Sequence, residues 1–172
     1  MNVRSMKQTG SALAISLIFL LILTFVGLSA IQTSTLQERM AGNSRDVNLA
    51  FQASEAAVRS AEVFLQSATL PDFNGANGRY QVCEDAESNS VECNPPDWKD
   101  LTSTGWVNVP EIDGANQLPQ YYIQKYISVY DQDQNLAADE PPQFVDIYRV
   151  VARGFGQSDQ SVVAIETTYR RD

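Results

Sequence analysis

An uncharged stretch of twenty residues, from Ala12 to Ile31, constrains this chain more than any other feature. As an α-helix rising about 1.5 Å per residue it would be about 30 Å long, which matches the hydrocarbon thickness of a bilayer. Arg4 and Lys7 precede the stretch, and the next charged residue is Glu38. By the positive-inside rule, we expect the N-terminus to stay in the cytoplasm and the rest of the chain to lie across the membrane.

Three kinds of N-terminal segment are compatible with this stretch. A secretory signal peptide would be cut after Ala30, although its apolar core normally has only about 7–15 residues. An uncut signal anchor would keep the N-terminus that the gene encodes. A cut on the cytoplasmic side, after Gly10, would make Ser11 the first mature residue and leave the whole apolar helix on the protein.

The chain continues as a second segment with helical periodicity. A mostly apolar stripe recurs at alternating steps of four and three residues, which predicts one face of a helix. The stripe consists of Val47, Phe51, Ser54, Val58, Ala61 and Leu65. Charged residues such as Asp46 lie between these positions and are expected to face solvent. At Gly42 and Asn43 we expect the helix to lose stability or unwind locally.

The remainder of the chain has the composition of a globular head. Closely spaced Pro, Gly and Asn residues indicate loops from about residue 71 to residue 110. Three later segments, 121–130, 144–155 and 161–170, are rich in β-branched and aromatic residues and predict strands. The short polar link between the last two predicts an antiparallel hairpin. The expected fold class is α+β, with a long N-terminal helix packed on an antiparallel sheet.

The composition excludes several classes of function. The chain has no histidine, which excludes histidine-dependent catalysis and the commonest metal ligand. Its formal charge is −9, so an acidic surface would repel phosphate backbones and we expect no nucleic-acid binding. No spacing of Asp and Glu singles out an acid and a base. We therefore predict no enzymatic activity, no cofactor and no metal.

The acidic segment from Asp131 to Asn135 places oxygen side chains at alternate positions, like the start of a calcium loop. An EF-hand needs glycine where Leu136 stands and glutamate where Pro142 stands, so this type of site is excluded. A looser calcium site that uses Asp139 or Glu140 stays an alternative to a solvated connection between strands.

The two cysteines, Cys83 and Cys93, have nine residues between them. This spacing differs from the Cys-x-x-Cys of redox and zinc sites, and two cysteines alone rarely complete a tetrahedral zinc site. A structural disulfide formed in an oxidising compartment is the expected arrangement, and two unpaired thiols are the alternative.

The segment from Thr33 to Glu62 reads TSTLQERMAGNSRDVNLAFQASEAAVRSAE and closely resembles the N-terminal region of PilX-type minor pilins of type IV pili. Arg4, Lys7 and Gly10 resemble the prepilin leader of such proteins, so the resemblance covers roughly residues 7–65. The tail YRVVARGFGQSDQSVVAIETTYRR is also similar to the closing strands of the family. The middle of the chain shows no such likeness.

The resemblance implies three parts: a prepilin leader at residues 1–10, a transmembrane and amphipathic helix at 11–67, and an extracytoplasmic head at 68–172. It implies cleavage between Gly10 and Ser11 by prepilin peptidase, followed by methylation of the new N-terminus. The implied function is a minor pilin that helps to initiate or cap type IV pilus assembly. The protein would reside in the inner membrane before assembly and in the pilus on the cell surface afterwards.

The implied partners are other minor pilins, the major pilin and the inner-membrane assembly machinery, with a tip adhesin as a further candidate. Two other functions stay open at this point. One is a membrane-anchored extracytoplasmic binding protein, such as an adhesin or a solute sensor. The other is a minor pseudopilin of a type II secretion system.

Ile15 departs from the usual pilin pattern. Counted from Ser11 it is the fifth mature residue, where most pilins have a glutamate thought to neutralise the charged N-terminus of the subunit above. An isoleucine cannot do so, and an unpaired charge in an apolar setting is costly. The resemblance therefore implies a place at the top of a filament, above which no further subunit needs neutralisation.

Overall fold

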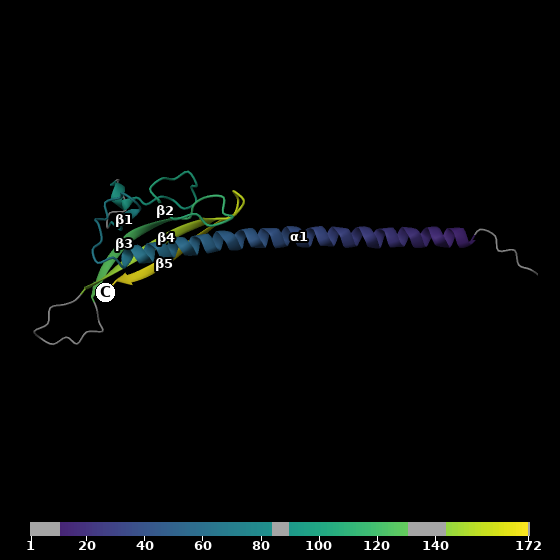
Figure 1. Ribbon diagram of the computed structural model, residues 1–172, viewed down its shortest axis with the longest axis horizontal. Helices are drawn as coiled ribbons and strands as arrows, with labels where there is room; N and C mark the ends of the chain where they lie inside the picture. Colours follow the sequence, from purple (N-terminus) through teal and green to yellow (C-terminus); the bar gives the residue numbers. More distant parts are fainter. Residues whose placement is uncertain (1–10, 84–89, 131–143, 172) are drawn as a thin grey trace, which may run out of the picture. The chain divides into compact units, whose positions relative to one another are not determined.

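The computed structural model describes residues 11–83, 90–130 and 144–171. It contains one long helix and five strands, with a short 3₁₀ helix between the first two strands (Figure 1). In chain order the elements are α1 (Ser11–Leu65), β1 (Arg79–Gln81), η1 (Val91–Cys93), β2 (Val107–Asn108), β3 (Gln120–Tyr130), β4 (Phe144–Phe155) and β5 (Val162–Arg171). By its internal contacts the chain divides into two compact units, Met1–Ser44 and Arg45–Asp172.

The helix α1 runs without interruption from Ser11 to Leu65, two residues short of the expected end. The local unwinding expected at Gly42 and Asn43 was wrong, because both residues are helical. One glycine in a helix costs only about 1 kcal/mol relative to alanine, which is too little to break a helix of 55 residues. The division of the chain at residues 10 and 67 stays a prediction.

The three expected strands are confirmed as β3, β4 and β5, and the last two form the expected antiparallel hairpin. The strand order is β1-β3-β4-β5, with β2 also paired to β3. The sheet is mixed, however, since β1 pairs with β3 in parallel. A parallel pair requires a long connection between its strands, and the excursion of the chain over residues 82–119 supplies it.

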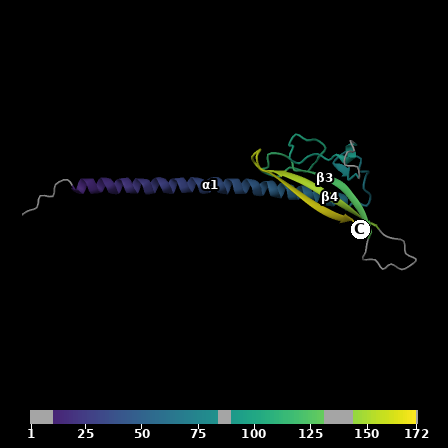
Figure 2. The same cartoon turned by 180° about the vertical axis from the view of Figure 1, so that it is seen from behind.

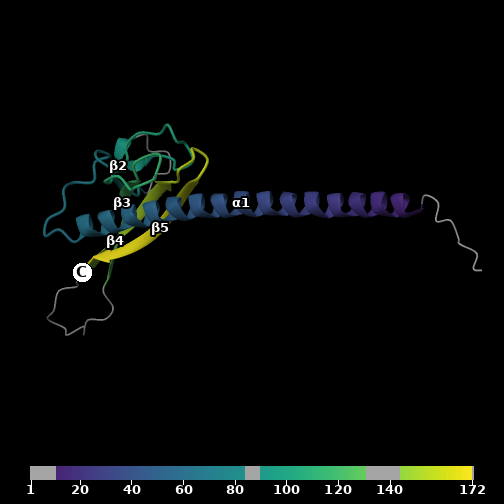
Figure 3. The same cartoon turned by 45° about the vertical axis from the view of Figure 1, so that its right-hand side comes forward.

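The second half of α1 packs on one face of this sheet, as Figures 2 and 3 show from two directions. Ala57, Ala61 and Leu65 are buried against a core from the strands. The main strand residues of that core are Tyr121 and Ile123 of β3 and Tyr148, Val150 and Ala152 of β4. An α+β, pilin-like arrangement of helix on sheet is therefore confirmed.

The helix face that meets the sheet is made of small side chains, which differs from the expected stripe. Ser54, Ala61 and Leu65 are buried as expected, but Val47 and Phe51 are 44% and 45% exposed. Their places are taken by Ala50, Ala53 and Ala57, which are fully buried. The expectation was wrong for Val47 and Phe51, because periodicity identifies a helix but does not tell how closely its partner approaches.

Gly154 of β4 explains the small residues. A Cβ at this position would overlap the backbone oxygen of Ala50 and the backbone nitrogen of Ser54. The backbones of β4 and α1 are therefore in direct contact, which only glycine on the strand and small residues on the helix permit. The larger side chains of α1 lie to either side of this contact.

Candidate functional site

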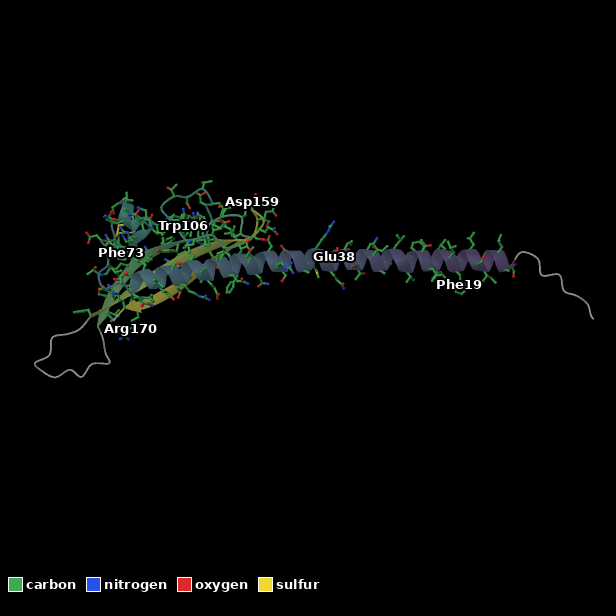
Figure 4. The ribbon with its side chains drawn as sticks, viewed as in Figure 1. Phe19, Glu38, Phe73, Trp106, Asp159 and Arg170 are labelled. Atoms are coloured by element: carbon green, nitrogen blue, oxygen red, sulfur yellow. A yellow bond between two sulfur atoms is a disulfide. The ribbon has the colours of Figure 1, made fainter. Side chains whose placement is uncertain are left out.

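The first half of α1 presents an apolar surface that has no partner within the described chain. All of residues 11–44 are exposed, and Phe19, seen at the far end of the helix in Figure 4, is 63% exposed. The best 18-residue window of α1 has a mean hydropathy of 2.6 with no buried residue. By length and composition, α1 could cross a membrane. Such a surface is stable only in lipid or against other apolar helices.

The polar residues in this half are compatible with an apolar environment because their hydroxyl groups bond to the helix itself. Thr24 donates to the carbonyl of Leu20 at 2.7 Å, and Ser29 donates to that of Phe25 at 2.9 Å. Ser16 and Thr33 make equivalent bonds. A hydroxyl satisfied in this way does not need water. The helix therefore carries serine and threonine at little cost in hydrocarbon.

The residues expected to direct assembly lie at the start of this half. Ser11 is the first described residue of α1, and Ile15 follows one turn later on the same side of the helix. No acidic residue occupies the first turn of α1. Within the first turn of α1, no carboxylate thus faces the positive end of the helix dipole. Gly10 and the predicted leader lie outside the described residues.

The acidic segment that was considered for calcium, with Asp139 and Glu140, also lies outside the described residues. Within residues 11–83, 90–130 and 144–171, no group of three His, Cys, Asp or Glu side chains could hold a metal ion. The absence of a metal site stays a prediction for the chain as a whole.

Cys83 and Cys93 are joined in a disulfide. The bond connects the chain just after β1 to the last residue of η1, and Ser90 Oγ lies 2.9 Å from Cys93 Sγ. A closed loop of this size typically stabilises a fold by about 2–3 kcal/mol. The disulfide therefore holds η1 close to the end of β1.

Arg153 anchors the irregular segment after η1 to the sheet face that lies away from α1. The side chain is 2% exposed, with its guanidinium 4.1 Å from the ring centroid of Trp106. Its Nε donates to Gln120 Oε1 at 2.8 Å, and its Nη1 donates to the carbonyl of Asp100 at 2.9 Å. Burial lowers the pKa of Arg153, and the nearby carboxylate of Asp100 opposes that effect. An arginine inside the apolar run of β4 was a signal for this role, but its partners are remote in sequence.

Asp46 forms a second anchor that the sequence did not indicate. Its carboxylate accepts hydrogen bonds from the backbone nitrogens of Gln157 and Ser158 at 2.5 and 3.2 Å. The hydroxyls of Ser158 and Ser161 also donate to it. The two serine hydroxyls are the main reason that the pKa of Asp46 falls to about 2. The expectation that Asp46 simply faces solvent was wrong, because it binds the turn between β4 and β5.

Comparison with known proteins gives two consecutive family matches. The model described as PilX N-terminal matches residues 9–59. The model described as Type IV pilus assembly protein PilX C-term matches residues 74–171. This match includes the middle region, whose sequence by itself shows no likeness to the family. No curated protein and no solved structure matches the chain. Because both matches occur in order and together span most of its length, the chain belongs to the PilX family of type IV pilus assembly proteins.

Proposed function

We propose that this protein is a minor pilin that helps to initiate or cap the type IV pilus and is located at the pilus tip. Ile15 is the observation that carries this proposal. It stands at the fifth mature position of a helix whose first turn has no carboxylate. The protein has no enzymatic role in this proposal, and it acts through its position in the assembly.

The proposed pathway begins in the inner membrane. The N-terminus lies in the cytoplasm, the head lies in the periplasm, and prepilin peptidase cuts between Gly10 and Ser11. The apolar half of α1, exposed in the described chain, is buried first in lipid and then among the helices of neighbouring subunits. Van der Waals packing between helices replaces contact with lipid in this exchange.

Ile15 then limits where the subunit can stand. Each subunit brings a charged amine into an apolar bundle, and burying an unpaired charge is costly. A glutamate at the fifth position would compensate that charge for a subunit above, whereas Ile15 offers no acceptor. The amine of Ser11 can still be met by the glutamate of the next subunit below. This asymmetry favours the top of the filament.

Cleavage is tested by mass spectrometry of the N-terminus. We expect the mature chain to begin at Ser11 and a bulky substitution, Gly10→Leu, to leave the full-length precursor. Ser11→Ala is the matched control and should be processed normally. A wild-type N-terminus at Met1 would contradict the pilin assignment and support an ordinary membrane anchor. Normal shortening of Gly10→Leu would contradict the assigned cut site.

Location is tested by immunogold labelling of sheared pili. Wild-type protein should label filament ends, and Ile15→Glu should allow labelling along the shaft because the missing acceptor is restored. Leu17→Glu is the control, since it places the same charge at a position without that role and should not enter the shaft. Even labelling of the shaft by the wild type would refute the tip location. Deletion of the gene should lower the number of surface pili while the major pilin persists in the membrane.

A further inference from the structure

The strand β5 forms an edge of the sheet that no described part of the chain covers. It pairs with β4 along its length, and the described backbone hydrogen bonds of Val162–Tyr169 join no other segment. The opposite edge differs, because β1 and β2 both pair with β3 there. Figure 1 shows β5 as the outermost strand. One side of the sheet is thus closed by the chain itself and the other is open.

The register shows which backbone groups are open. The nitrogen of Gly156 donates to the carbonyl of Ser161 at 2.8 Å, so these two residues form a hydrogen-bonded pair. Hydrogen-bonded pairs alternate along an antiparallel ladder, and this places Val163, Ile165 and Thr167 among the residues bonded to β4. The N–H and C=O groups that point away from the sheet are those of Val162, Ala164, Glu166 and Thr168.

This edge lacks the features that normally prevent strand pairing. Exposed edges are commonly protected by proline, by lysine, by bulges or by short length. The segment Val162–Tyr169 contains no proline, glycine or lysine, and Glu166 is its single charged residue. Arg170 and Arg171 end the strand, so only this segment is without protection. It continues the β4 register without a shift. It is therefore a suitable template for an added strand.

On the helix side of β5 lies a ledge of apolar side chains, which we define as Val47, Phe51, Val163 and Ile165. Leu49 approaches Gly114, in the loop that leads to β3. By helix geometry, Val47 and Phe51 lie on the flank of α1 away from Leu49. Both are about half exposed. Val163 and Ile165 are only partly buried. A strand added to β5 would place alternate side chains over this ledge.

The other side of β5 is polar. A groove of about 440 Å³ is lined there by Tyr126, Ile147, Arg149, Glu166 and Thr168. Arg149 Nη2 donates to Glu166 Oε2 at 2.7 Å, while the Glu166 side chain stays 58% exposed. Buried nearby, Arg149 Nε and Gln124 Oε1 have no partner in the described chain. The groove can therefore receive a polar side chain from an added strand.

A second copy of this protein fits the edge poorly. Asp46, early in the packed half of α1, binds the turn before β5. Arg171, at the end of β5, donates to the carbonyls of Ser67 and Ala68, just after the end of α1. The strand β5 therefore runs in the same direction as α1. Antiparallel pairing of two β5 strands would thus direct two α1 helices oppositely. In the proposed pilus, the packed helices of neighbouring subunits run in one direction. We therefore take a segment of a different protein as the occupant.

We propose that the β5 edge binds an extended segment of another protein as an added antiparallel strand. The segment carries apolar residues at alternate positions, which cover the ledge. Its other positions are polar and uncharged, because they face a groove in which Glu166 is already paired with Arg149. Main-chain hydrogen bonds to Ala164, Glu166 and Thr168 provide affinity, and the two rows of side chains provide specificity. The site is independent of whether the protein stands at the pilus tip.

The test uses the full chain in detergent micelles and a fluorescein-labelled nine-residue peptide in which valine alternates with glutamine or threonine. We expect saturable one-to-one binding and at least tenfold slower hydrogen exchange at the amides of Ala164, Glu166 and Thr168. Ala164→Pro removes one outward N–H and should weaken binding at least tenfold. Ala164→Val is the matched control, because it keeps the N–H and should bind like the wild type.

Two further measurements keep the test decisive. If Ala164→Pro lowers the melting temperature, Thr168→Pro and a peptide with N-methylated alternate amides replace it. The N-methylated peptide should not bind at all. Failure of the first peptide to bind, or equal binding by Ala164→Pro and Ala164→Val, would overturn the proposal. A dimer in analytical ultracentrifugation that Ala164→Pro abolishes would also overturn it, since a second copy would then be the occupant.

Discussion

The two compact units of this protein use apolar side chains in opposite ways. In the described part of the first unit, residues 11–44, every side chain is exposed, including large ones such as Leu13 and Phe19. In the second unit, the side chains of Leu65, Val150 and Phe155 are almost completely buried within the head. Burial of apolar surface provides about 25 cal/mol per Å². The first unit can gain this stabilisation only from lipid or other chains.

The same helix therefore serves two purposes with two residue types. Its first half carries leucine, isoleucine and phenylalanine on all sides, as expected of a segment surrounded by apolar neighbours. Its second half turns alanines toward the sheet, where the backbone of β4 is in contact. Substitutions that disturb the head should consequently change its stability, and those in the exposed half should not. The following predictions test that difference.

The largest effect is expected at Gly154. Gly154→Ala places a Cβ against the backbone of Ala50 and Ser54, which cannot move aside without separating α1 from β4. We expect the free energy of unfolding to fall by about 3 kcal/mol or more in urea titrations of the full chain in detergent. Gly42→Ala is the control, since its Cβ would meet nothing within 4 Å and should leave stability equal or slightly higher. Equal midpoints for the two variants would refute the close contact.

A second test removes the anchor at Arg153. Arg153→Met keeps the apolar volume but loses the bonds to Gln120 and Asp100 and the contact with Trp106. We expect a loss of about 2–3 kcal/mol. Trp106 fluorescence, read in a Trp98→Phe background, should shift to longer wavelength. Arg153→Lys should not restore stability because lysine lacks the planar fork. An unchanged spectrum would contradict the anchoring role.

A third test follows the pH dependence of Asp46. Its pKa in the folded protein is about 2 against an ordinary value of 3.8, so its stabilising contribution is present above about pH 4. That contribution is lost as the pH falls from about 4 toward 2. The difference in melting temperature between the wild type and Asp46→Asn should therefore shrink over this interval. Ser161→Ala removes one hydroxyl donor, so its melting temperature should lie between those of the wild type and Asp46→Asn. A constant difference would contradict the lowered pKa.

The smallest effect is expected at Phe51. Because Phe51 is 45% exposed, Phe51→Ala should cost less than about 1 kcal/mol of unfolding free energy. Leu65→Ala is the matched comparison. Because Leu65 is fully buried, this substitution should lower the free energy of unfolding by about 3 kcal/mol. Weakened binding of the alternating peptide by Phe51→Ala would then identify the ledge as a docking surface. Equal costs for the two variants would show that Phe51 belongs to the core.

The main elements of the fold could be predicted from residue patterns. The apolar run and the helical periodicity predicted one long helix, and β-branched and aromatic residues located β3, β4 and β5 to within one or two residues. Spacing arguments also favoured the disulfide that joins Cys83 to Cys93. These features depend mainly on residues close together in the chain, which explains why they could be predicted.

The contacts that organise the head were not predictable in this way. Asp46 and Ser158 are 112 residues apart in sequence, and Arg153 and Asp100 are 53 apart. Hydropathy predicted that Asp46 faces solvent, because the sequence around a carboxylate does not reveal which distant groups will donate hydrogen bonds to it. The parallel pairing of β1 was missed for a related reason, since a strand of three residues carries little pattern of its own.

The amino-acid sequence alone determined the membrane-length helix, the class of the fold and the likeness to pilins. Each of these depends on local hydropathy, on periodicity or on the order of residues in a short motif. Only the tertiary structure decided which face of α1 meets the sheet, what Asp46 and Arg153 bind, and which edge stays open. The physical reason is that these properties depend on distances between backbones. The contact at Gly154 shows this most clearly, because it selects alanines over the larger residues beside them.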